Sequence, residues 1–217
     1  FQYILDPNGR GDYSSLQVLT EAHDGESFST LLKSGTYPET GGVTIDENDC
    51  YIMVAPGSTI TGAITLSGAG ITLVLGPGCT LSGALDISAA NITLELMGGC
   101  TLAGIDVNGV TDWRIIGGGW ADISDGGATR TGLNLVAGSH RGIVDNMSFD
   151  NTSGGGSGTS AVYSNDTEST VYKSIRVIDS DIDGFYNHTA GGGEGSTGTL
   201  YEGCYVANAD DDGIRVD

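Results

Sequence analysis

The sequence predicts an all-β solenoid, because one segment recurs along the chain at a short, nearly constant interval. The segment that begins at Ile71 is written again at Ile92, 21 residues later, and a copy one residue shorter begins at Tyr51. Each copy consists of short alternating apolar runs punctuated by glycine and proline, which is a pattern of strands and turns. A unit this short cannot bury its own apolar face, so successive copies must stack and share one core.

The repeat also predicts which side chains form that core. Equivalent positions should build two inward stacks, one of Ile60, Leu81, Leu102 and Ile123 and one of Ile71, Ile92 and Trp113. Cys79 and Cys100 are equivalent as well and should lie one above the other, within the Cα range of a disulfide. We expect two buried free thiols instead, because a stacked apolar ladder needs no covalent bond.

The amino-acid composition argues against two classes of binding partner. The 217 residues include 37 glycines, and 28 acidic side chains against 8 lysines and arginines give a net charge of −20. This charge opposes nucleic acid and anionic membranes, whose phosphates bind to clustered cations. It is compatible with a halophilic or marine setting, with calcium binding, or with a surface selected for solubility. No run of 18 apolar residues is present, so we expect no membrane insertion.

Residues 1–49 do not match the repeat and are predicted to be an N-terminal cap, since the open end of a solenoid exposes core and unpaired strand edges. We expect a strand over residues 3–5, a short helix capped by Ser14 or Ser15 and ending at Ala22, and a second strand over residues 28–32. Residues 35–39 should turn out of that strand. The solenoid is predicted to occupy residues 50–217.

The later repeats are longer. Units that contain Phe149, Val177 and Val206 at equivalent positions recur at spacings of 28 and 29 residues, which indicates inserted loops over residues 124–131, 152–159 and 188–199. In solenoids such insertions cluster on one face and often form the binding surface. The last strand pattern, from Ile214, has no following repeat to cover it, so we expect a homotrimer or another protein at this end.

The opening of the chain is similar to a known superfamily. Its pattern of Asp6, Gly9, Gly11-Asp12-Tyr13 and Ser15-Leu16-Gln17, followed by Gly35-Thr36-Tyr37-Pro38-Glu39, resembles the opening of pectin lyase-like proteins, including pectinesterases and many phage tailspikes. The resemblance implies a single-stranded right-handed parallel β-helix, a solenoid of about seven coils. Each coil would consist of three short parallel strands, and the first part of the chain would cap them.

Acidic residues in the last repeats are the strongest local signal of chemistry. Asp179, Asp181 and Asp183 match the first half of a calcium loop, but Ala190 stands where an EF-hand needs a bidentate acid. In an extended strand the three carboxylates would share one face and could bind calcium there. The alternative is a solvated acidic surface. No other cofactor is expected.

Asp211 and Asp212 follow one repeat later, because Asp212-Gly213 aligns with Asp183-Gly184. Stacked carboxylates about 5 Å apart resemble the dyad of a retaining glycosidase, with Arg215 available to hold an acidic sugar. Asp183, Asp211, Asp212 and Arg215 are therefore the candidate catalytic residues if the chain is an enzyme. The motifs that carry catalysis in pectinesterase-like, pectate lyase-like and polygalacturonase-like proteins are otherwise absent from the sequence.

Five Asn-x-Ser/Thr sequons exceed the number that composition alone would produce and predict glycosylation at Asn91, Asn146, Asn151, Asn165 and Asn187.

Three functions remain after these observations. The first is a non-enzymatic virion protein, a tailspike, fibre or capsid decoration, that contacts host-surface glycans or other virion proteins. The second is a polysaccharide lyase or glycoside hydrolase, and the third is a secreted adhesive surface protein. All three place the chain on a virion surface or outside the cell, and the expected partners are further copies of the chain, other virion proteins or a polysaccharide.

Overall fold

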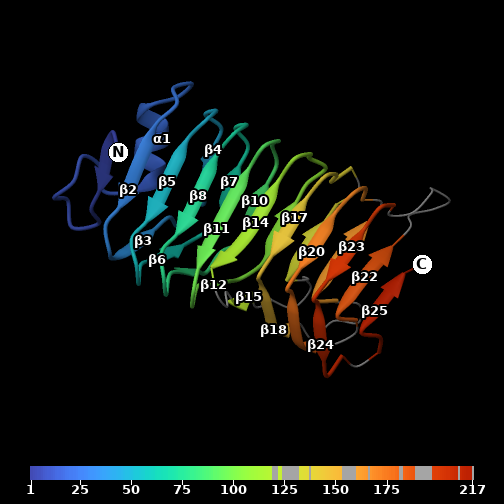
Figure 1. Cartoon of the computed structure of the whole chain (residues 1–217). Helices are drawn as coiled ribbons and strands as arrows, with labels where there is room; N and C mark the ends of the chain where they lie inside the picture. The colour runs from blue at the N-terminus through green and yellow to red at the C-terminus, as the bar shows by residue number, and fades with distance from the viewer. Residues whose placement is uncertain are drawn as a thin grey trace.

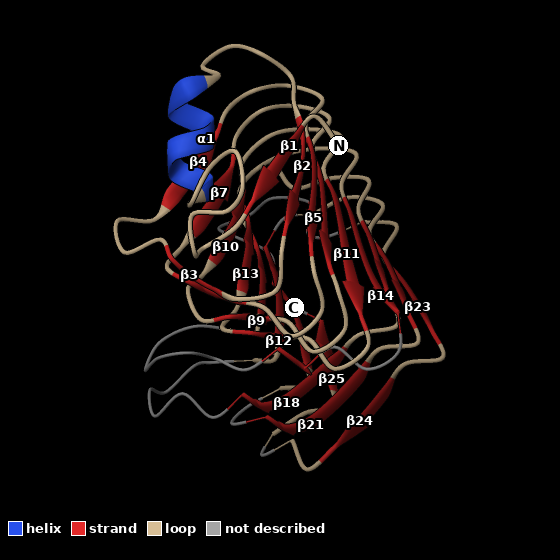
Figure 2. Cartoon of the chain, turned by 90° about the vertical axis from the view of Figure 1, so that its left-hand side faces the viewer, coloured by secondary structure: helices blue, strands red, loops and turns tan. Residues whose placement is uncertain are grey.

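The computed structural model describes residues 1–118, 122–123, 132–136, 138–152, 160–165, 167–180, 183–188, 197–209 and 211–216. In these ranges the chain is all-β with the helix α1 (Leu16–Ala22), and the strands form three parallel sheets. Successive repeats follow one another from the N-terminal to the C-terminal end (Figure 1). Figure 2, a view from the N-terminal side, shows the three sheets around a common interior. The arrangement is consistent with a parallel β-helix or related solenoid.

Each repeat contributes one strand to each sheet in turn. Sheet A contains β1 (Tyr3–Leu5), β2 (Ser29–Leu32), β5 (Tyr51–Val54), β8 (Thr72–Leu75), β11 (Thr93–Met97), β14 (Arg114–Gly118), β17 (Ile143–Asp145), β20 (Val171–Lys173) and β23 (Leu200–Glu202). Sheet B contains β3 (Thr36–Pro38), β6 (Thr59–Thr61), β9 (Thr80–Leu81), β12 (Thr101–Leu102), β15 (Asp122–Ile123), β18 (Ser148–Thr152), β21 (Arg176–Ser180) and β24 (Tyr205–Ala207). Sheet C contains β4 (Val43–Ile45), β7 (Ile64–Leu66), β10 (Leu85–Ile87), β13 (Ile105–Val107), β16 (Leu133–Leu135), β19 (Val162–Asn165), β22 (Phe185–His188) and β25 (Ile214–Val216).

The strand register follows the sequence repeat. Thr72 pairs with Thr93, which pairs with Arg114, and the longer later spacing appears as the pairing of Arg114 with Ile143. Both predicted core stacks are confirmed where side chains are described, since the following residues are 0 or 1% exposed: Ile60, Leu81, Leu102, Ile71, Ile92 and Trp113. Ile123 pairs with Leu102 in the backbone register, but its side chain lies outside the described part.

The cysteine prediction is confirmed as well. Cys79 and Cys100 are buried and carry free thiols. Each Sγ donates to a carbonyl oxygen of the preceding repeat, that of Ala55 for Cys79 and that of Gly76 for Cys100, both at 3.2 Å. Burial raises the pKa of both thiols, so they remain neutral and pack as small apolar side chains.

The predicted elements of the cap are present. Ser15 caps α1 by accepting the Val18 N–H at 3.2 Å, and β1 and β2 pair in parallel at the start of sheet A. The turn predicted for residues 35–39 is wrong, because β3 occupies residues 36–38 and pairs with β6. Pro38 is tolerated because β3 is the edge strand of sheet B, where one side of the strand needs no donor. All three sheets thus continue across the predicted boundary between residues 49 and 50.

Glu39 joins this first repeat to the helix. Its side chain is 1% exposed, and its carboxylate accepts the N–H groups of Leu16 at 2.7 Å and Gln17 at 3.4 Å. These N–H groups belong to the first turn of α1, where no intrahelical acceptor is available. The segment Gly35-Thr36-Tyr37-Pro38-Glu39, which resembles a pectinesterase sequence, therefore has a structural role here. Its Glu39 supplies acceptors to the first turn of the helix at the N-terminal end.

The core changes character toward the C-terminal end. Tyr172 stacks on Tyr201 with ring centroids 5.2 Å apart, and Phe185 meets both rings edge-on. The Tyr172 hydroxyl lies 2.7 Å from the Ser164 hydroxyl, so its polar atom is satisfied inside the core. Most of each predicted insertion lies outside the described residues. None of the described helical residues forms a segment long and apolar enough to cross a membrane.

Candidate functional site

A continuous row of polar and aromatic side chains runs along the outer face of sheet C. In β10, β13, β16, β19 and β22 the first and third residues are buried, so the residue between them points outward. The parallel register places these middle residues side by side from one repeat to the next. The sheet C row consists of Asp86, Asp106, Asn134, Tyr163, Tyr186 and Arg215, all of them partly exposed.

Contacts between neighbours order the row. The Asn134 Nδ2 group donates to Asp106 Oδ1 at 3.0 Å. The Tyr163 and Tyr186 rings meet edge-to-face at 5.5 Å, and the Arg215 guanidinium carbon lies 5.0 Å from the centroid of the Tyr186 ring. Cation–π and edge-to-face contacts of this kind hold the side chains in defined orientations before any ligand arrives.

His188 extends the aromatic part of the row. It lies two residues after Tyr186 on β22, and its Nδ1 is 3.1 Å from the Tyr186 hydroxyl. Its ring centroid lies 6.2 Å from that of Tyr163, so three rings from two adjacent repeats form one group. Aromatic faces beside carboxylate, amide and guanidinium groups can stack on the apolar face of a sugar while they exchange hydrogen bonds with its hydroxyls.

A second group of interest lies before β22 and β25, where the chain enters sheet C. Oxygen atoms of Asp183, Asp211 and Asp212 all lie within 4.8 Å of one another. Asp183 is 0% exposed, whereas Asp211 and Asp212 are exposed. This grouping of the candidate catalytic acids agrees with the sequence alignment of Asp183-Gly184 with Asp212-Gly213.

Asp183 has partners for both of its oxygens. Oδ1 accepts the Asp212 N–H at 3.2 Å, and Oδ2 accepts the Ser160 hydroxyl at 3.4 Å. Burial raises the pKa of Asp183, and the Asp212 N–H and the charge of Arg215 oppose this shift only in part. Arg215 also forms an ion pair with Asp211 at 3.9 Å. The cluster can thus store a proton on Asp183 or hold a hard cation.

The predicted calcium site of Asp179, Asp181 and Asp183 needs a correction. Asp179 has a left-handed backbone with φ of 55°, is exposed, and accepts a hydrogen bond from Asn208 Nδ2 at 2.8 Å. Asp183 is buried instead, and Asp181 lies outside the described residues. The extended strand that would align these carboxylates ends at Ser180, so Asp183 groups with the next repeat and not with Asp179.

The glycosylation candidates differ in exposure. Asn91 is exposed, and Asn146 is partly buried and donates through Nδ2 to the Gly117 carbonyl at 2.9 Å. Asn165 is partly buried, and the side chain of Asn151 lies outside the described part. Asn187 is 3% exposed inside sheet C, so the expectation for Asn187 is wrong: the folded chain leaves no room there for a glycan.

The tyrosines and amide of the sheet C row were missed by reasoning from the sequence, although a signal was present. The strand centres Tyr163 and Tyr186 each stand between two buried residues, and Arg215 holds the equivalent place in β25. Alignment of the repeats on those core positions would have placed the three side chains in one line. Comparison of the chain with family models, with curated proteins and with solved structures finds no match.

Proposed function

We propose that the chain is a non-catalytic polysaccharide-binding protein and that it binds a neutral glycan along the sheet C row. The observation that carries this proposal is the line of Asp106, Asn134, Tyr163, Tyr186 and Arg215 across successive strands. Strands in a sheet lie about 4.8 Å apart, which is close to the length of one hexose unit. A glycan chain laid along the row would therefore meet a new side chain with each sugar.

The fold and setting that we propose follow the resemblance of the opening segment. We propose a single-stranded right-handed parallel β-helix of the pectin lyase-like kind, with about seven coils after the cap. The tailspike-like opening supports a place on a virion surface, where such a protein would contact host glycans. Quantifying the chain in purified particles tests this setting separately from glycan binding.

The charge of the chain favours a neutral ligand. A net charge of −20 repels an anionic polysaccharide, and salt screens this repulsion only beyond about 8 Å at physiological ionic strength. Asp86 and Asp106 add negative charge within the row itself. Carboxylates instead suit neutral sugars, because they accept hydrogen bonds from sugar hydroxyls.

Binding is better supported than hydrolysis. A general acid must reach the glycosidic oxygen, within hydrogen-bond distance. Asp183, the acid whose pKa is raised, is fully buried beneath the surface and is hydrogen-bonded to Ser160 and to the Asp212 N–H. Arg215 is held over the Tyr186 ring. The member of the cluster whose pKa is raised is therefore out of reach of a bound sugar.

Calorimetric titration with soluble neutral glucan, mannan and galactan, and with polygalacturonate as the anionic comparison, tests the proposal. We expect at least one neutral polysaccharide to bind, and Tyr186→Ala and Tyr163→Ala each to weaken that binding about tenfold or more. Tyr51→Ala is the matched control, because Tyr51 is an exposed tyrosine on sheet A.

Three results would contradict the proposal. They are the absence of binding by every probe at about 10 mM sugar, an equal loss in the Tyr51→Ala variant, and stronger binding of polygalacturonate than of any neutral glycan. Release of new reducing ends during the same titrations would favour the hydrolase alternative.

A further inference from the structure

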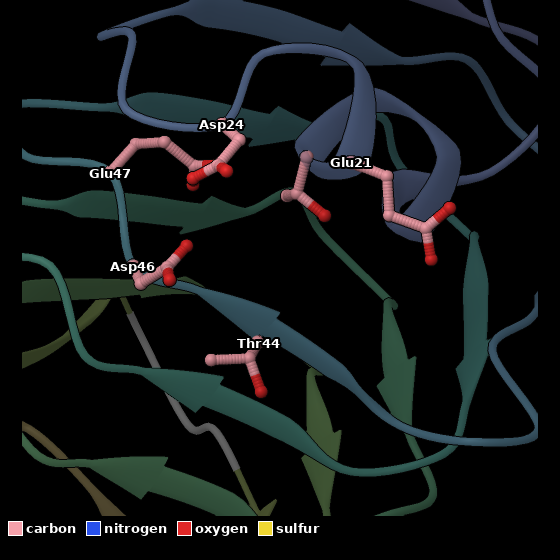
Figure 3. Close-up of a pocket in the computed structure, with 6 residues that line it drawn as sticks. Glu21, Asp24, Thr44, Asp46 and Glu47 are labelled. Atoms are coloured by element: carbon pink, nitrogen blue, oxygen red, sulfur yellow. The ribbon is translucent and has the colours of Figure 1, made fainter.

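A pocket lined by acidic side chains lies between the capping helix and the first repeat. Its volume is about 350 Å³, and it is bounded by α1, the loop that follows α1, and β4 with the turn after it. Its lining residues are Thr20, Glu21, Asp24, Thr44, Asp46 and Glu47. Figure 3 shows the side chains of Asp24 and Glu47 directed toward one another, with Asp46 beside them.

Glu47 is the unusual member of this group. It is 2% exposed, and its Oε2 atom is buried without a hydrogen-bond partner. A buried carboxylate oxygen with no donor is costly, and native structures normally satisfy such atoms with protein, water or an ion. Among the ion pairs of the described residues, none joins a lysine or arginine to Glu47 or to the other three carboxylates of the pocket.

The charged groups around Glu47 also bear on what the pocket could bind. Burial raises the pKa of Glu47, and the charges of Asp46 and Asp24 raise it further, while the nearby N–H groups of Glu47 and Asp46 oppose the shift. Two of the neighbours that disfavour its charge are thus carboxylates, which a bound cation would turn into co-ligands. A cation bound in the pocket would supply the partner that the Glu47 Oε2 atom lacks.

We propose that this pocket is a calcium site in which Glu47 is the fixed ligand and Asp24 and Asp46 complete the coordination. Asp24 and Asp46 are exposed, so their side chains can turn toward an ion that Glu47 holds. The rim adds the Glu21 carboxylate and the hydroxyls of Thr20 and Thr44. Calcium suits this set because it accepts six to eight oxygen ligands in flexible geometry, including water, whereas magnesium needs a near-ideal octahedron.

The acidic cluster of Asp183, Asp211 and Asp212 does not meet the same condition. The buried carboxylate of Asp183 already accepts hydrogen bonds from the Ser160 hydroxyl and from the Asp212 N–H, so each of its oxygens has a donor without an ion. In the cap pocket an ion would connect the loop after α1 with the turn after β4. It would thereby fasten the helix that covers the N-terminal end to the first repeat.

Thermal unfolding with and without calcium, together with calorimetric titration of calcium chloride, tests the site. For a dissociation constant of about 0.1 to 1 mM, about 10 mM calcium should raise the melting temperature by about 3 to 10 °C. Magnesium should have a much smaller effect. Glu47→Gln, which keeps the shape of the side chain, should abolish the calcium-dependent rise, and Asp24→Asn, a change at an exposed position, should reduce it.

The double variant Asp211→Asn, Asp212→Asn is the matched control, and it should keep the full calcium response. Hydrogen exchange adds a local measurement, because calcium should slow exchange in residues 16–24 and 43–48 and not around β25. The proposal is overturned if calcium does not bind, if Glu47→Gln and Asp24→Asn respond to calcium as the parent does, or if the double variant alone loses the response.

Discussion

Asp183 shows how a single buried acid ties stability to pH in this chain. Its folded pKa is raised by burial, so between the unfolded value near 3.8 and the raised folded value the folded chain binds more protons than the unfolded chain. The free energy of unfolding must then fall as the pH rises through this window. Asp183→Asn removes the effect, because the amide still offers an acceptor oxygen to the Asp212 N–H but has no proton to lose in this pH range.

We therefore expect the melting temperature of Asp183→Asn, relative to the parent, to increase from about pH 4 upward. Asp112→Asn is the control of opposite sign. Arg141 lowers the pKa of Asp112 through two charge-assisted hydrogen bonds, so the stability that Asp112 supplies is present above the unfolded pKa and is lost in acid. A difference for Asp183→Asn that does not vary with pH would contradict the burial of a titrating acid at this position.

A second residue-scale prediction concerns Trp113, which is fully buried in the stack that begins with Ile71 and Ile92. Gly142 occupies the equivalent place in the next repeat, and a Cβ atom there would overlap the Trp113 ring. Gly142→Ala should therefore lower the free energy of unfolding, measured by urea denaturation, by about 1 to 3 kcal/mol. Gly41→Ala is the control, because a Cβ atom at this position meets no neighbouring atom, and it should leave the free energy of unfolding almost unchanged. Gly57→Ala is less suitable because Gly57 has a positive φ.

At the scale of the elements, Glu39 is expected to hold α1 in place. Glu39→Gln would turn one of its two acceptor oxygens into a donor that faces a backbone N–H of the first helical turn. The free energy of unfolding should fall by about 1 to 3 kcal/mol, because buried N–H groups are left without a charged acceptor. Glu95→Gln, at an exposed position in β11, should change it by less than about 0.5 kcal/mol. Equal stability of the two variants would contradict the expectation that Glu39 holds α1 in place.

The elements that the sequence predicted well are those that repeat. Leu81 and Leu102 could be assigned to the core because the same apolar position returns in each copy, and period and burial agree. Ser15 could be assigned as the N-cap of α1 because that preference is local. Asp183 and Asp212 could be aligned for the same reason as the leucines, since Asp-Gly recurs one repeat apart.

The elements that could not be predicted depend on contacts between parts that do not repeat. The sequence predicts a turn over residues 35–39, but residues 36–38 form β3, where Pro38 is tolerated only because β3 is an edge strand. Glu47 looks like an ordinary surface acid in the sequence, but it is buried and lines a pocket that residues of α1 and of the turn after β4 share. Tyr163 and Tyr186 carry no apolar periodicity of their own, since they point away from the core.

At the scale of the whole molecule, the C-terminal repeat exposes apolar side chains. Leu200, Tyr205, Ile214 and Val216 are 48 to 65% exposed on β23, β24 and β25, which are the last strands of the three sheets in the described chain. Unpaired strand edges with apolar side chains favour association with another chain. We expect the purified chain to self-associate through these side chains, and light scattering should then give a mass above the 22.1 kDa of one chain.

Val216→Asp should lower that mass, since Val216 is the most exposed of the four side chains and a charge opposes apolar association. Val18→Asp, at an exposed position on α1, should leave the mass unchanged. A monomer mass for the parent chain at every concentration would contradict association through these side chains.

We propose that one glycan chain lies along the sheet C row and contacts a new repeat with each sugar. The most direct test is a calorimetric series of oligosaccharides of increasing length, taken from whichever neutral polysaccharide binds. Affinity should rise with each added sugar up to about five units, as the ligand spans the strands from Asp106 to Arg215 about 4.8 Å apart, and should then level off. A monosaccharide that binds as tightly as the longest oligosaccharide would contradict the account, because the site would then be a single pocket and not a row.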